Sequence, residues 1–217
     1  MPEPAEVARR LLAQQWPQSA AFLARAEKEL ALPGFGFRGL FASVPRRIGA
    51  VAETRPAVPT ELPAARPHWT LTDYARLWLI AGALVSVPVV EQPGFVLRLF
   101  EAGELGEQVS VLRVLSALPD ARRFVEVGLQ ACRTNAKDVF EAIVCENRFL
   151  AEYFEPLNFN QAVMKAIFME VALARVEQLE GRITPELSRM AAGYVSERRA
   201  AGRSVPSDAE YLSQYRG

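Results

Sequence analysis

The run Arg133–Val171, RTNAKDVFEAIVCENRFLAEYFEPLNFNQAVMKAIFMEV, decides the fold class of this chain. Apolar residues in it recur at spacings of three and four, the period of a helix that buries one face. One set is Val139, Phe140, Ile143 and Val144, and the other is Val163, Met164, Ile167, Phe168 and Val171. The run therefore predicts two packed helices that are joined by an aromatic turn.

Six polar side chains interrupt these apolar sets, and we take them as candidate ligand-binding residues. They are Asn135, Glu141, Asn147, Asn160, Gln161 and Lys165. Gln161 and Lys165 are four residues apart and so share a helix face. For Asn135 and Asn160 the alternative is helix capping, because an asparagine side chain can satisfy a free amide group of a first turn.

Glu141 and Lys165 would approach one another if their two helices packed antiparallel. Because a buried charge is costly unless it is paired and hydrogen-bonded, three interpretations stand side by side. Both side chains face solvent, or they form a structural ion pair among the neighbouring amides, or they line a pocket and contact a ligand.

The rest of the chain shows the same helical periodicity, and no stretch alternates as a strand does. We expect one all-α domain over 1–217, built of antiparallel helix pairs in an array, either a HEAT-like stack or a more closed bundle, without a sheet. A helical hairpin is predicted at 4–32, an extended proline-rich connection at 45–67, and the helical array at 70–217. One helix is expected to extend from Val163 towards Gly181.

Two helix starts carry strong signals. Thr70 and Asp73 have the spacing of a capping box, and Thr184 followed by Pro185 places a cap before a proline at the first helical position. Residues 34–39 match the dinucleotide-binding pattern G-x-G-x-x-G, but a helix precedes them instead of a strand, so we reject that function. A tight reversal of the chain is the better interpretation, with the neighbouring aromatic residues Phe35, Phe37 and Phe41 packing on the core.

Composition excludes several classes of function. The 217 residues carry no net charge, which argues against a nucleic-acid binder. The most apolar run, Leu77–Val90, is shorter than the roughly 20 residues of a membrane-spanning helix. The N-terminus lacks the pattern of a signal peptide, so we expect a cytoplasmic protein. Cys132 and Cys145 are then expected to be free thiols.

A single histidine, His68, leaves little room for a histidine-dependent catalytic triad or zinc site. We expect a loop histidine, and no metal or other cofactor.

Several short motifs lie in the order found in one known family. They are Ala42–Arg47 (ASVPRR), Trp69–Thr70, Gly103–Leu105, Ala117–Pro119, Arg133–Asn135, Val139–Ile143, Asn147, Tyr153–Phe154, Asn160–Gln161, Lys165–Ala166, Glu197–Arg198 and Ala200–Arg203 (AAGR). On these motifs the chain resembles the EboA-like proteins over about nine tenths of its length. It departs from the family pattern at Arg148–Leu150, Arg199 and Tyr211.

The resemblance implies a cytoplasmic helper in the traffic of a secondary metabolite or its precursor, and it implies no reaction. Two hypotheses follow. The first is a non-catalytic protein that binds a small apolar metabolite or scaffolds partner enzymes of its gene cluster. The second is a metal-independent enzyme that uses Glu141 as acid or base beside Lys165, since such a residue would have to be desolvated and tuned.

Overall fold

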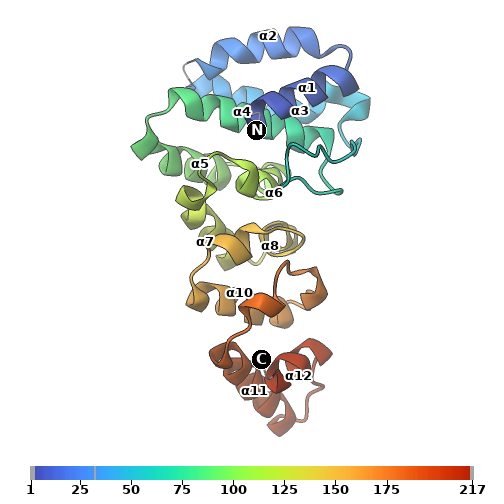
Figure 1. Ribbon diagram of the computed structural model, residues 1–217, viewed down its shortest axis with the longest axis vertical. Coiled ribbons are helices and arrows are strands. Elements are labelled where there is room, and N and C mark those ends of the chain that lie inside the picture. Colours follow the sequence, from blue (N-terminus) through green and yellow to red (C-terminus); the bar gives the residue numbers. More distant parts are fainter. Residues whose placement is uncertain (1–2, 32, 216–217) are drawn as a thin grey trace. The chain divides into compact units, whose positions relative to one another are not determined.

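The fold is all-α, as the sequence predicted. The computed structural model describes residues 3–31 and 33–215. For Phe35, within the second range, it describes the backbone but not the side chain. Over these residues it contains α-helices, short 3-10 turns and no strand (Figure 1). The predicted packing of Phe35 therefore lies outside what is described.

The chain forms two compact units, Met1–Ala131 and Cys132–Gly217. Unit 1 contains α1 (Pro4–Gln15), α2 (Ser19–Leu30), α3 (Phe35–Ile48), α4 (Leu71–Ser86), α5 (Gln92–Glu101) and α6 (Leu105–Val114). Helix α7 (Val125–Arg133) crosses the boundary. Unit 2 contains α8 (Lys137–Val144), α9 (Phe149–Tyr153), α10 (Pro156–Phe168), α11 (Pro185–Ala200) and α12 (Ser207–Gln214).

Helix α4 is the centre of unit 1. It is apolar nearly all round, and burial extends from Leu71 to Leu84 with only Gly82 partly exposed. A helix of this kind must be covered on every side. α1 packs along it, α3 and α6 also pack against it, and α2 adds a further contact (Figure 1). The expected hairpin at 4–32 is thus two helices, α1 and α2, of which α1 packs mainly on α4.

In unit 2 the first predicted helix face is confirmed, since Val139, Phe140, Ile143 and Val144 are all buried in α8. The second is confirmed in part. Val163 and Ile167 are buried in α10, but Phe168 is 74% exposed at the last position of that helix.

The predicted continuation of this helix towards Gly181 is wrong. Glu170 adopts a left-handed conformation (φ 56°), and the amide of Val171 donates to the carbonyl of Ala166 at 2.9 Å. This is the Schellman arrangement that ends a helix, so α10 ends at Phe168 and the chain continues through 3-10 turns.

The proline-rich segment also begins later than predicted. Pro45 lies inside α3, which continues to Ile48. Proline removes one amide hydrogen bond, yet the helix persists because Val44 and Ile48 are buried on its inner face.

Both strong helix starts are confirmed. Thr70 and Asp73 form a reciprocal capping box at α4, and the Thr184 hydroxyl accepts from the amide of Leu187 at 3.2 Å at α11. Gly34 is the N-cap of α3, and Gly36 and Gly39 lie inside that helix, so the tight reversal predicted at 34–39 is wrong. A helix at these positions also lacks the strand–turn–helix context of the nucleotide motif. No described helix is long and apolar enough to cross a membrane.

Candidate functional site

Glu141 lies on α8 and belongs to a surface cluster of ion pairs. Arg175 donates to its carboxylate through Nη1 at 2.6 Å, and Lys137 Nζ lies 3.8 Å from it one turn away. The same guanidinium also donates to Glu146 at 2.8 and 3.0 Å. With its side chain 24% exposed, Glu141 remains in contact with solvent at the edge of unit 2.

Lys165 has different partners. Its ammonium group donates to the carbonyls of Cys132 at 2.7 Å and Thr134 at 2.6 Å, and it lies 5.3 Å above the ring centre of Phe140. Cys132 lies in the last turn of α7 and Thr134 directly follows that helix, where carbonyls lack partners within the helix. Of the three interpretations, a structural ion pair between Glu141 and Lys165 is therefore wrong, because each side chain is engaged elsewhere.

Asn147 connects two helix ends. Its side-chain amide donates to the carbonyl of Ala142 at 2.9 Å, and its side-chain oxygen accepts from the amide of Phe149 at 3.0 Å. It is 5% exposed and follows Glu146, whose φ of 46° is left-handed. The asparagine thus satisfies main-chain groups at the sharp reversal between α8 and α9.

Asn160 is buried within α10, so its predicted role as a helix N-cap is wrong; the N-cap of α10 is Glu155. Its side-chain nitrogen lies 3.4 Å from the Thr184 hydroxyl, and among the described residues its side-chain oxygen has no partner. This amide links α10 to the start of α11, because Thr184 is also the cap of that helix.

Asn135 and Gln161 are exposed, and their side chains form no hydrogen bond within residues 3–31 and 33–215. The capping role predicted for Asn135 is wrong, since Ala136 is the N-cap of α8 and no side chain caps it. The hydroxyl of Thr134, the residue before Asn135, accepts from the amide of Ala136 at 3.1 Å instead. The six candidate residues are thus distributed over α8, α10 and the connections before and after α8.

Both cysteines are free thiols, as predicted. Burial raises the pKa of Cys132 to about 12 although the Lys165 charge opposes that shift, and burial raises the pKa of Cys145 to about 12 as well. Because the thiolate is the reactive form, neither sulfur is set up as a nucleophile or metal ligand near neutral pH.

An open groove lies in unit 1 between α3 and the C-terminal half of α5. It has a volume of about 530 Å³, within the range of small-molecule sites. Its lining consists of Pro33, Gly34, Phe37, Arg38, Phe95, Arg98, Leu99, Glu101 and Ala102. It forms because α3 packs on α4 while α5 packs on α6, which leaves a space between the two outer helices.

The floor of the groove is apolar and aromatic. The rings of Phe37 and Phe95 lie 5.4 Å apart between centres and are tilted by 53°. Phe37 and Leu99 are buried, whereas Phe95 is partly open to solvent. An arrangement of this kind offers ring faces to a flat or aliphatic molecule.

Charged side chains border this floor. Arg38 donates through Nη2 to the carbonyl of Ala102 at the end of α5. The guanidinium of Arg98, in the last turn of α5, makes neither a hydrogen bond nor an ion pair with any part of the chain that the structure describes. Glu101 is the one carboxylate in the lining, so the groove carries one net positive charge.

The sequence did not identify this groove. It predicted Phe37 only as a residue that packs on the core, and a pattern of apolar residues does not distinguish a core contact from a pocket wall. Arg98 also has Glu101 three residues later, a spacing that predicts a surface ion pair instead of a free guanidinium.

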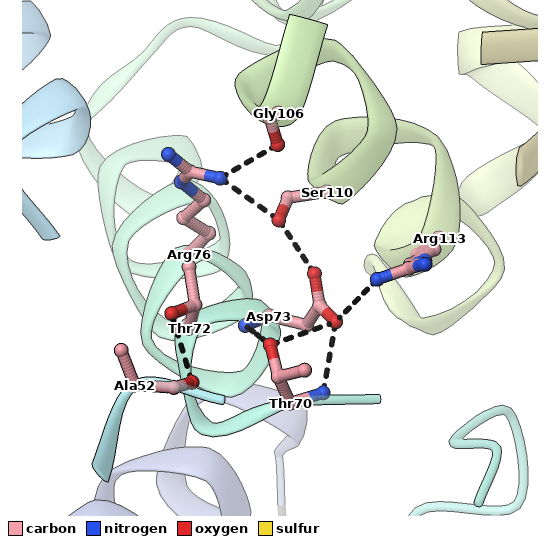
Figure 2. A network of polar contacts seen from close by, with 8 residues as sticks. All are labelled: Ala52, Thr70, Thr72, Asp73, Arg76, Gly106, Ser110 and Arg113. Atoms are coloured by element: carbon pink, nitrogen blue, oxygen red, sulfur yellow. Dashed lines mark hydrogen bonds and ion pairs between the residues drawn. The ribbon is translucent and has the colours of Figure 1, made fainter. Parts of the chain in front are cut away.

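A buried polar network links α4 to α6 in unit 1 (Figure 2). Asp73, 1% exposed, accepts from the amide of Thr70 at 2.9 Å, from the hydroxyl of Ser110 at 2.5 Å and from Arg113 Nη1 at 3.2 Å. Arg76 donates to the Ser110 hydroxyl at 2.9 Å and, at 2.8 Å, to a main-chain carbonyl of α6.

This network connects helices. Its serine hydroxyl donates to the Asp73 carboxylate and accepts from the Arg76 guanidinium, so the one hydroxyl links a side chain of each charge. Burial raises the pKa of the neighbouring Tyr74 to about 12, and the Asp73 charge adds to that shift. The sequence signal was Asp73 and Arg76 within a helix that is otherwise apolar.

No three His, Cys, Asp or Glu side chains gather into a metal-binding group within the part of the chain that the structure describes. The family model of the metabolite traffic protein EboA matches residues 35–212, which is most of the chain. This protein belongs to the EboA family. The match includes every helix from α3 to α11 and most of α12, and with them the six predicted residues and the groove lining apart from Pro33 and Gly34. No curated protein and no solved structure matches the chain.

Proposed function

We propose that this EboA-family protein is a non-catalytic helper in metabolite traffic and that it holds a small apolar metabolite in the groove between α3 and α5. The observation that carries the proposal is the aromatic floor of a groove of about 530 Å³, in which Phe95 is partly open to solvent and packs on the buried ring of Phe37. The family name supports the metabolite as cargo.

The chemistry of the lining favours binding over catalysis. Apart from Glu101, the charged groups are two guanidinium groups, which do not exchange protons near neutral pH. The polar residues of unit 2 do not supply an alternative, since Glu141 and Lys165 are engaged with separate partners. We place this carrier in the cytoplasm, a location that fractionation of the source cells tests.

Native mass spectrometry of protein purified gently from its source cells tests the carrier function. We expect a bound small molecule on the wild type and at least a tenfold lower occupancy on Phe95→Ala. Phe168→Ala is the matched control, because it removes an exposed phenylalanine from unit 2. An unliganded mass for all three proteins, with no binding of added apolar compounds, would overturn the proposal.

A row of exposed apolar residues along α10 supports a second candidate function, the docking of one partner enzyme of the same pathway. Leu157 and Phe168 are 63% and 74% exposed, and the partly exposed Met164 lies between them on the same face of the helix. Exposed apolar residues in such a row are typical of protein contacts.

Binding of each purified pathway enzyme to the wild type and to the Leu157→Glu, Phe168→Glu double variant tests this docking. We expect one enzyme to bind the wild type and to bind the double variant at least tenfold more weakly. Equal affinity of every enzyme for the two proteins would exclude α10 as the contact.

A further inference from the structure

We infer that the groove between α3 and α5 selects an apolar molecule that carries one anionic group, which Arg98 and Arg38 bind at the rim. A carboxylate, a sulfonate and a phosphate monoester share the required chemistry. This inference rests on the proposed carrier function and adds the charge of the ligand to it.

Arg98 is the main candidate for binding the anionic group. Its guanidinium lies close to the main chain of Gly94, where an added Cβ would meet Nη1 at 3.1 Å. A side chain at position 94 would therefore push the guanidinium away from its present place. With five donors in a planar fork and no partner along the described chain, Arg98 presents an uncommitted site for an oxyanion.

Arg38 supplies the second positive group from the facing helix. One of its terminal nitrogens is bound to the carbonyl of Ala102, which fixes the guanidinium at the end of α5, and the other donors remain uncommitted. The two arginines therefore reach the same groove from α3 and α5.

The negative charge of Glu101 repels an anion in the groove, but the two positive charges of Arg38 and Arg98 outnumber it. The Glu101 carboxylate forms no ion pair with Arg98 despite the favourable spacing, and it accepts no hydrogen bond within the described residues. The apolar floor and the charged rim together favour a ligand with an apolar body over Phe37 and Phe95 and a negative group beside the guanidinium groups.

A pair of fluorescent probes with the same aromatic body tests this selection. 8-Anilinonaphthalene-1-sulfonate carries a sulfonate, and N-phenyl-1-naphthylamine lacks it. Because a charge-assisted hydrogen bond at a partly exposed site contributes modestly, we expect the anionic probe to bind the wild type about tenfold more tightly.

Arg98→Gln is the informative variant. We expect it to weaken binding of the anionic probe about tenfold and to leave the affinity for the neutral probe unchanged, while Arg98→Lys restores part of the loss. Arg25→Gln is the control, because Arg25 is exposed on α2, outside the groove, and has no partner among the described residues. It should change neither affinity.

Phe95→Ala separates the inference from the function on which it rests. If it weakens both probes and Arg98→Gln weakens neither, the groove binds apolar molecules without regard to charge and the inference is overturned alone. If neither probe binds the wild type, or if Phe95→Ala affects neither probe, the groove is not a ligand site and both proposals fail. Circular dichroism confirms that each variant has kept its helices.

Discussion

The two units use buried polar side chains differently. In unit 1, Asp73, Ser110 and Arg76 bond mainly to one another and so join α4 to α6. In unit 2, Lys165 and Asn147 bond to main-chain groups at helix ends. Helix length explains the difference. α4 has 16 residues, whereas α8 has 8 and α9 has 5, and every helix end leaves unsatisfied main-chain groups.

Polar residues in apolar helical segments therefore find two kinds of partner. Where helices are long, a buried charge needs another side chain as its partner, so it marks a contact between helices. Where they are short, the nearest unsatisfied groups are carbonyls and amides at the ends. Among the polar residues of 133–171, Lys165 and Asn147 are explained by this second demand.

Asp73→Ala should have the largest effect. It leaves Arg113 and the capped amide of Thr70 without their acceptor, and removing one member of a buried charged pair costs about 3–5 kcal/mol. Trp16, Trp69 and Trp78 are the three tryptophans of the chain and all lie in unit 1, so the urea midpoint of tryptophan fluorescence measures the loss.

Glu6→Ala, which removes an exposed acid from the first turn of α1 in the same unit, is the control and should cost less than about 1 kcal/mol. An equal shift for the two variants would show that the network does not stabilise unit 1.

Lys165→Met should destabilise unit 2 by about 2 kcal/mol. The substitution keeps the apolar stem but removes the charged donor to the carbonyls of Cys132 and Thr134. Hydrogen exchange of the amides in α8 and α10 measures the change, while tryptophan fluorescence of unit 1 should not shift.

Lys137→Met is the matched control, since its ammonium group makes one exposed contact with Glu141. If both lysines gave the same small change, the capping role assigned to Lys165 would be refuted.

Asn147→Ala should cost about 1–2 kcal/mol. It leaves a main-chain carbonyl of α8 and the amide of Phe149 without their shared partner in a buried place. Faster hydrogen exchange is expected first at the start of α9. Asn158→Ala, a partly exposed asparagine of α10, should leave the exchange of α9 unaltered.

Glu141→Gln should have the smallest effect, below about 1 kcal/mol, because its contacts with Arg175 and Lys137 are partly exposed. The difference between this variant and the wild type should shrink further in 1 M salt, where screening is strong. A loss above about 2 kcal/mol that salt does not change would place Glu141 among the structural groups of unit 2.

Local signals in the sequence predicted local structure well. The burial of Val139, Phe140 and Ile143 follows from their spacing, and the cap at Thr184 follows from one hydroxyl and one proline. Predictions that depended on partners failed. A Lys165–Glu141 ion pair was one of three interpretations, and it does not form because Lys165 bonds to carbonyls at the end of α7, whose position periodicity does not reveal.

The sequence by itself determined that the chain is all-α, where the strongest helices begin, and, through its motifs, that it belongs to the EboA family. These depend on periodicity, capping and motif order, which are properties of neighbouring residues. Only the tertiary structure decided that Phe37, Phe95 and Arg98 border one groove and that Asp73 meets Ser110. The physical reason is that such sites are made by residues far apart in the chain, and their positions are set by how whole helices pack.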